Sequence, residues 1–126
     1  MKLRPALLGA GALVLCLSAH AGPVPANALR SPDGKSVAWQ VKDNEIRLDH
    51  NGKTRSLKCG PFIREFWFWQ DGSRIAIDCG GGHFAGREIL YDSATLKQLD
   101  SFDQAVVPLE KRPEWSSSGV TRSAGE

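Results

Sequence analysis

The chain lacks any net charge once its N-terminal leader is set aside. The 126 residues contain 16 Lys and Arg against 14 Asp and Glu, and the excess consists of Lys2 and Arg4. From Gly22 onward, 14 cations stand against 14 anions. Without a basic excess the chain has no electrostatic footprint for nucleic acid or for an anionic membrane surface. We therefore expect neither as a partner.

Metal ligands and catalytic motifs are also scarce. Beyond the leader the chain keeps only two cysteines and two histidines, Cys59, Cys79, His50 and His83, whereas a structural metal site needs three or four ligands. There is no C-x-x-C pair, no G-x-S-x-G elbow, and no glycine-rich phosphate motif leading into a helix. The sequence therefore predicts no metal, no cofactor and no catalytic residue.

Long apolar runs are missing everywhere except at the N-terminus. There, Ala6 to Leu17 follows two basic residues and precedes Ala19-His20-Ala21, an A-x-A cleavage site. The run is too short to span about 30 Å of hydrocarbon comfortably. The pattern predicts a secretory signal peptide over residues 1–21, cleaved after Ala21, and a periplasmic or secreted protein with no stable membrane anchor after cleavage.

The two remaining cysteines, Cys59 and Cys79, are 20 residues apart. In an oxidising compartment, a structural disulfide between them is the first expectation. Two other interpretations remain: a pair of buried free thiols, or a redox pair, which the spacing disfavours.

Turn residues divide residues 29–103 into short segments of alternating hydrophobicity. Asp-Gly and Asn-Gly pairs between such segments are strong hairpin signals, and no segment beyond the leader has a helical period. The sequence predicts an all-β fold, an antiparallel meander of about seven strands, with residues 53–58 at a sheet edge. The expected strands cover residues 36–41, 45–49, 53–58, 62–69, 74–79, 87–92 and 96–102.

The most apolar part of the chain is Phe62 to Cys79, FIREFWFWQDGSRIAIDC. Because side chains alternate along a strand, Phe66 and Phe68 share one face, and Trp67 and Trp69 share the other. A strand with large aromatics on both faces is normally covered on both. We interpret the cluster as core and place this strand at the centre of the packing. The alternative is a carbohydrate or peptide platform.

An internal repeat links this stretch to an earlier one. SPDGKSVAWQV matches WQDGSRIAIDC at an offset of 38, so that Val37, Trp39 and Val41 fall over Ile75, Ile77 and Cys79. EIRLD from Glu45 then matches EILYD from Glu88 at an offset of 43. The five extra residues fall in the Gly80–Gly86 loop. A period near 40 with about four strands per unit is typical of propeller blades.

The pattern of SPDGK, an alternating strand, a polar turn and a second short strand resembles the TolB-like (WD40-like) propeller repeat of bacterial envelope proteins. The resemblance implies two propeller-blade-like sheets, from residues 29–58 and 62–103, packed face to face. It also implies binding of another envelope protein or of a small ligand. Closed propellers have at least four blades, so oligomerisation and descent from a longer protein are alternatives to a self-contained pair.

The candidate ligand-binding residues are Gly80, Gly81, Gly82 and His83, in the loop that the second repeat has gained. Glycines expose backbone N–H groups, and His83 offers a base or a ligand contact. The alternative is a flexible insertion between two strands. Asp78 is a further candidate, either as a carboxylate pair with Glu88 or Asp92, or in a salt bridge with Arg74 or Arg87.

The extension over residues 104–126 loses the strand pattern. Its apolar residues, among them Trp115, are expected to dock on the sheet, whereas SSSGVTRSAGE resembles a disordered tail, so we expect the extension to be partly disordered. The sequence thus favours an exported, non-enzymatic β-repeat binding module, including inhibitor- or immunity-like roles. Two alternatives remain: a small periplasmic hydrolase using His83 with a nearby Asp or Glu, and a structural subunit of a larger β-assembly.

Overall fold

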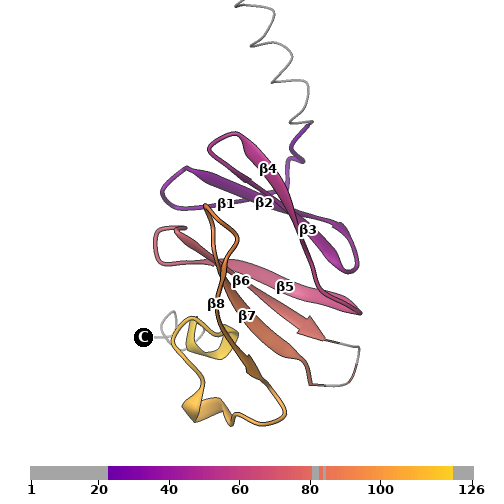
Figure 1. Cartoon of the computed structure of the whole chain (residues 1–126), viewed down its shortest axis with the longest axis vertical. Coiled ribbons are helices and arrows are strands. Elements are labelled where there is room, and N and C mark those ends of the chain that lie inside the picture. Colours follow the sequence, from indigo (N-terminus) through magenta and orange to yellow (C-terminus); the bar gives the residue numbers. More distant parts are fainter. Residues whose placement is uncertain (1–22, 81–82, 84, 121–126) are drawn as a thin grey trace, which may run out of the picture.

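The computed structural model describes residues 23–80, 83 and 85–120, so the predicted signal peptide lies outside the described residues. Eight strands form two four-stranded antiparallel sheets, each a simple meander (Figure 1). This architecture confirms the predicted all-β fold. The strands are β1 (Leu29–Arg30), β2 (Ser36–Lys42), β3 (Glu45–His50), β4 (Lys53–Lys58), β5 (Phe62–Trp69), β6 (Arg74–Gly80), β7 (Arg87–Asp92) and β8 (Gln98–Asp103).

The strand beyond the expected seven is β1, two residues that pair with Val37 and Ala38. A 3-10 helix, η1 (Leu109–Lys111), follows β8. Within the described residues, no helix is long and apolar enough to cross a membrane. As predicted, β4 forms an edge of its sheet.

The main core lies between the two sheets, which we call the first sheet (β1–β4) and the second sheet (β5–β8). β3 contributes Ile46 and Leu48, and β6 contributes Ile75 and Ile77, all essentially inaccessible to solvent. The expectation that the aromatic strand is central was wrong: β5 is the first strand of its sheet, and β6 is the most buried. Phe66 and Phe68 nevertheless pack against this core, because every second side chain of β5 points towards the first sheet.

A second, smaller core covers the other face of the second sheet. Trp67 and Trp69 pack there with Ala76, Leu90 and Phe102, and Trp115 closes the cluster from the C-terminal segment. The expected docking of Trp115 and the expected covering of both faces of β5 are thereby confirmed. We call residues 104–120 the cap. In Figure 1 the cap forms a third layer, on the side of the second sheet away from the first.

Both hydrogen bonds and apolar contacts hold the cap on the second sheet. The Trp67 indole N–H donates to the Trp115 carbonyl at 2.8 Å, and the Trp115 indole N–H donates to Asp100 at 2.9 Å. Arg112 lies over the Phe102 ring, 5.5 Å from its centroid, a cation–π distance. The predicted disorder of the tail therefore does not extend over residues 116–120, and residues 121–126 lie outside the described residues.

The internal repeat is visible in the hydrogen bonds of the two Asp-Gly turns. Asp33 Oδ1 accepts from the N–H of Lys35 at 2.9 Å, and Asp71 Oδ1 accepts from the N–H of Ser73 at 3.0 Å. The turns also stack, because the Asp33 N–H donates to the Asp71 carbonyl at 2.8 Å. A hydrogen bond from the Ser31 hydroxyl, the larger cause, and one from the Lys35 N–H hold the pKa of Asp33 below its usual value.

A glycine is required where the two turns meet. Gly72 has a φ of +110°, and a Cβ on it would come within 2.3 Å of the Ser31 Cβ. A side chain there would be strained in its backbone and would also collide with the first repeat.

The second half of the repeat is offset by 42 residues in space, not by the 43 that the EIRLD and EILYD match predicts. The Asn51 N–H donates to the Lys35 carbonyl, and the Ser93 N–H donates in the same way to the Ser73 carbonyl, both at 2.9 Å. Lys35 to Ser73 is the offset of 38, so Asn51 corresponds to Ser93. The loop after β6 has therefore gained four residues.

The two sheets stack in the same sense, so that one face of the first sheet packs on the opposite face of the second, and they are not related by a two-fold axis. Ile75 and Ile77 face the first sheet. Their counterparts in the repeat, Val37 and Trp39, alternate with Ala38, which faces the second sheet, and so they point away from it. In the repeat, the outer face of the first sheet thus corresponds to the face of the second sheet that packs against the main core.

The predicted disulfide between Cys59 and Cys79 is formed, with 6.0 Å between the Cα atoms. It joins the segment that leaves β4 to the end of β6, and so fastens the first sheet to the second. Hydrogen bonds add to this junction: the Ile63 N–H donates to the Asp43 carbonyl at 2.7 Å, and the Gln40 amide donates to the Ile63 carbonyl at 3.2 Å.

Candidate functional site

The predicted glycine-loop site is only partly described. Gly80 is the buried last residue of β6, and a Cβ on it would meet the guanidinium of Arg64 at 2.6 Å. His83 is exposed. Gly81 and Gly82 lie outside the described residues. Gly80 and His83 are therefore placed, but no pocket is described around them.

A different feature, the edge of β5, stands out among the sheet edges that the structure describes. Edge strands expose unpaired backbone groups, and proteins usually protect them by shortness or by charge. β1 has two residues, β4 begins and ends with lysine, and β8 carries two aspartates in six residues. β5 runs for eight residues and ends in Phe66-Trp67-Phe68-Trp69. Among the described edge strands it is the longest, and its last four residues are all aromatic.

The direction of the β5 backbone groups follows from the pairing of its neighbour. The Ser93 N–H donates to the Ser73 carbonyl, so Ser73 and every second residue after it along β6 turn their backbone groups towards β7. In an antiparallel sheet the intervening residues turn theirs to the opposite neighbour. Arg74, Ala76 and Asp78 therefore bond to β5.

The residues of β5 that face these three are Trp69, Trp67 and Glu65. Their N–H and C=O groups are used towards β6, so those of Phe66 and Phe68 point out of the sheet. Ile63, farther along, is the residue whose outward groups meet Asp43 and Gln40. We call the outward N–H and C=O groups of Phe66 and Phe68 the open edge; no hydrogen-bond partner for them is described.

A small pocket of about 140 Å³ adjoins the open edge. It is lined by Glu65, Phe66 and Trp67 of β5, and by Ser117 and Val120 of the cap. Since no residue of β6 lines it, the pocket lies beside the outer margin of the sheet. The indole of Trp67 gives it an apolar wall, and Glu65 gives it a carboxylate.

Three carboxylates lie side by side on neighbouring strands, on the face of the second sheet that the cap covers. Glu65 on β5 is paired in register with Asp78 on β6, and Asp78 with Glu88 on β7. We call these three residues the acidic row. The predicted neighbourhood of Asp78 and Glu88 is thus correct, whereas Asp92 faces Arg74 and accepts hydrogen bonds within its own turn.

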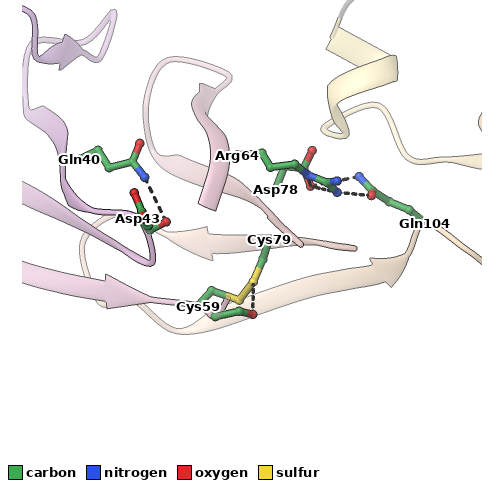
Figure 2. The surroundings of a disulfide bond; sticks show 8 residues. Gln40, Asp43, Cys59, Arg64, Asp78, Cys79 and Gln104 are labelled. Carbon is green, nitrogen blue, oxygen red and sulfur yellow. Dashed lines mark hydrogen bonds and ion pairs between the residues drawn. A yellow bond between two sulfur atoms is a disulfide. The ribbon is translucent and has the colours of Figure 1, made fainter. Parts of the chain in front are cut away.

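Asp78 has an arginine partner, but a different one from those expected. Arg74 and Arg87 were the predicted partners, and the observed ion pair is with Arg64, at 2.9 Å. The reason is geometric: a bulge between Ile63 and Glu65 shifts the register of β5 next to Asp78. Figure 2 shows Arg64 and Gln104 gathered around Asp78, while the adjacent Cys79 reaches Cys59 on the other side of β6.

Glu88 is fully buried and depends on the cap for its hydrogen bonds. Its carboxylate accepts from the N–H of Ser117 at 2.7 Å, the Ser117 hydroxyl at 2.9 Å and the Gln104 amide at 2.8 Å. The Gln104 amide group also donates to Asp78 at 3.2 Å, and its oxygen accepts from Arg64 at 2.7 Å. Two members of the acidic row are therefore compensated.

Glu65 has no direct contact of this kind among those described. It is exposed, and no hydrogen bond or ion pair to it is described. Partial burial raises its pKa above the usual value, the charges of Asp78 and Glu88 raise it further, and the charge of Arg64 offsets part of this rise. Sequence reasoning missed Glu65, because only the bulge in β5 and the placement of the cap bring it beside a pocket.

A search of protein-family models, of curated proteins and of solved structures finds no match to this chain. Among the described residues, no group of three His, Cys, Asp or Glu side chains is placed to hold a metal ion. The function must therefore be inferred from the fold and from the edge of β5 with its pocket.

Proposed function

We propose that this chain is an exported, non-enzymatic binding module that recognises another polypeptide by adding a strand of that partner to β5. The observation that carries the proposal is the open edge: it belongs to the aromatic second half of a long strand, while the other described edges are short or carry charge along their length. Strand addition supplies affinity through main-chain hydrogen bonds and specificity through pockets for alternate side chains.

Two further features support this proposal. The Cys59–Cys79 disulfide suits an oxidising compartment, in agreement with the expected export to the periplasm or beyond. The same-sense stacking of two four-stranded meanders is compatible with the proposed kinship to TolB-like propeller repeats, a family of envelope proteins that bind other proteins or small ligands.

The test uses a matched pair of variants at Phe68. Phe68→Ala and Phe68→Pro both remove the ring, but only proline also removes the outward N–H, which has no described partner within the chain. A photo-crosslinking amino acid is placed at Glu65 in each exported variant, and at Leu99 on β8 as the control for the opposite edge. We expect a discrete adduct with one polypeptide from Glu65 and none from Leu99.

The adduct should persist in Phe68→Ala at reduced yield, fall at least a further fivefold in Phe68→Pro, and remain unchanged in His83→Ala. Equal yields from Phe68→Ala and Phe68→Pro would contradict strand addition. Loss of the adduct in His83→Ala would move the site to the glycine loop.

A further inference from the structure

The pocket beside the open edge indicates which residue of a partner it would accept, an inference that rests on the proposed function. In an antiparallel pair, residues directly opposite each other point to the same side of the sheet. A residue of an added strand that lies opposite Glu65 or Trp67 therefore points to the side on which the cap lies. That side holds the pocket lined by Glu65, Phe66, Trp67, Ser117 and Val120.

The charge around the pocket is negative. Glu65 lies on its wall, and Asp78 and Glu88 follow in register across the next two strands. Asp78 is offset by Arg64, and Glu88 by hydrogen bonds from the cap. Over residues 62–103 as a whole, seven Asp and Glu stand against four Lys and Arg. Glu65 is thus a carboxylate beside two others, with the charge of Arg64 nearby but with no described cation in contact with it.

The remaining wall of the pocket suits an aliphatic stem. Trp67 is half-buried and presents an indole, while Val120 adds a methyl surface from the cap. Lysine and arginine pack their methylene groups along apolar surface while the charged end reaches a polar group. A cation over an indole gains a further attraction. A volume of about 140 Å³ leaves room for one such side chain and not for a large rigid ligand.

We propose that the partner of the open edge is an extended polypeptide segment that places a lysine or arginine in this pocket, against Glu65 and Trp67. The main chain of the segment would bond to the N–H and C=O groups of Phe66 and Phe68, and its basic side chain would fill the cation position of the acidic row. A basic group there relieves the repulsion that Asp78 and Glu88 exert on Glu65.

The test uses defined peptides and the full mature chain labelled with ¹⁵N. The probes are acetylated, amidated heptapeptides of alternating threonine and valine whose central residue is lysine, norleucine or glutamate. A fourth peptide keeps the lysine but has proline on both sides of it, so that it cannot pair as a strand. Affinity is read from chemical shifts, and strand addition from hydrogen-exchange protection of the Phe66 and Phe68 amides.

We expect the lysine peptide to bind about fivefold more tightly than the norleucine peptide at low ionic strength, and the glutamate peptide to bind least. The preference should shrink at 1 M salt. Glu65→Gln should abolish the preference for lysine and keep the amide protection. The control Glu110→Gln, which removes an exposed charge on η1, should keep both.

Each contrary result has a distinct meaning. Equal binding of the lysine and norleucine peptides, with protection of both amides, would overturn the basic pocket and leave strand addition standing. Absence of protection with every peptide would overturn strand addition itself. Binding of the proline peptide as tightly as its parent would do the same. Protection without peptide, accompanied by a dimeric mass in light scattering, would identify a second copy as the occupant and overturn the basic segment.

Discussion

The residue that most depends on its surroundings is Glu88, because a fully buried carboxylate is costly unless donors satisfy it. Two of its three described donors come from Ser117 in the cap, one from the backbone and one from the hydroxyl. This arrangement places a charge in the second core only when the cap is docked. A change that undocks the cap would therefore leave the Glu88 carboxylate without its hydrogen-bond donors and destabilise the fold.

Ser117→Ala tests this dependence. The substitution removes the hydroxyl donor and keeps the backbone donor, and a hydrogen bond to a charged group contributes about 1.5–3 kcal/mol. We expect the free energy of unfolding in urea to fall by about 1–2 kcal/mol. Ser118→Ala, whose hydroxyl meets the Ser116 hydroxyl instead, is the matched control and should cost less. Equal losses in the two variants would contradict the role of Ser117.

Glu65 behaves in the opposite way, because the folded state disfavours its charge. Its pKa is raised in the folded protein above the ordinary 4.5, so its stabilising contribution is complete below pH 4.5 and is lost as the pH rises through the folded pKa. Glu65→Gln should therefore stabilise the fold at pH 7 and have no such effect at pH 3.5. Urea unfolding at both pH values measures this, and a pH-independent difference would contradict it.

For single residues, the sequence predicted the placement of side chains where strand alternation decides the face, or where an oxidising compartment favours a disulfide. Phe66, Trp67 and the two cysteines belong to that class. It missed Arg64 and Glu65, because a bulge changes which residues of β5 face β6, and no local signal in FIREFWFW marks a bulge. The position of a pocket residue that is set by a β-bulge cannot be predicted from the alternation of side chains along a strand.

Among the elements, the disulfide bears most directly on how the two sheets are joined. It closes a loop with a sequence separation of 20 between the first sheet and β6, and in the chain-entropy model such a loop stabilises the fold by about 3 kcal/mol. The doubly substituted Cys59→Ser, Cys79→Ser chain should lose about that amount in urea unfolding.

The control for the disulfide is the reductant itself. Dithiothreitol should destabilise the natural chain by a similar amount and leave the double variant unchanged. Mass spectrometry of the exported protein should find no free thiol. Two free thiols, or an unaltered unfolding midpoint in dithiothreitol, would contradict a stabilising disulfide.

The repeat shows how far element-level inference reaches. The offset of 38 between the Asp-Gly turns is correct, because hydrogen bonds to Asp33 and Asp71 define both turns. The offset of 43 for the second match was wrong by one residue, because it rests on three shared letters, Glu, Ile and Asp, across a loop whose length the sequence does not determine. In a strand a shift of one residue exchanges the faces. The offset of 43 would match Leu48 with Tyr91, which packs against the main core, whereas the offset of 42 matches it with Leu90, which faces the cap.

For the whole molecule, the same-sense stack raises the question of what ends it. At the positions equivalent to the buried Ile89 and half-buried Tyr91 of the second sheet, the outer face of the first sheet carries the charged residues Arg47 and Asp49, beside Val37 and Trp39. The outer face of the second sheet carries an apolar cluster beside the acidic row, and the cap covers it. This role is not predictable from the local sequence, because a polar segment such as SSSGV docks only on a face that four separate strands create.

The cap therefore explains how two repeats suffice where stacked repeats usually need three or more. Without it, Ala76, Leu90 and Phe102 would form an exposed apolar face, of the kind that drives association. We expect the mature chain to be monomeric in light scattering, and a chain ending at Asp103 to self-associate or aggregate in a concentration-dependent way.

A chain ending at Val120 is the matched control, since it keeps the whole cap, and it should remain monomeric. Trp115→Ala gives a milder variant should the shortest chain fail to fold. It keeps the backbone of the cap, loses the indole bond to Asp100, and should lower the free energy of unfolding by about 3–5 kcal/mol, the usual cost of removing a buried tryptophan. A chain ending at Asp103 that stays monomeric and as stable as the natural protein would show that the two sheets need no cap. An oligomeric natural chain would instead indicate a subunit of a larger β-assembly.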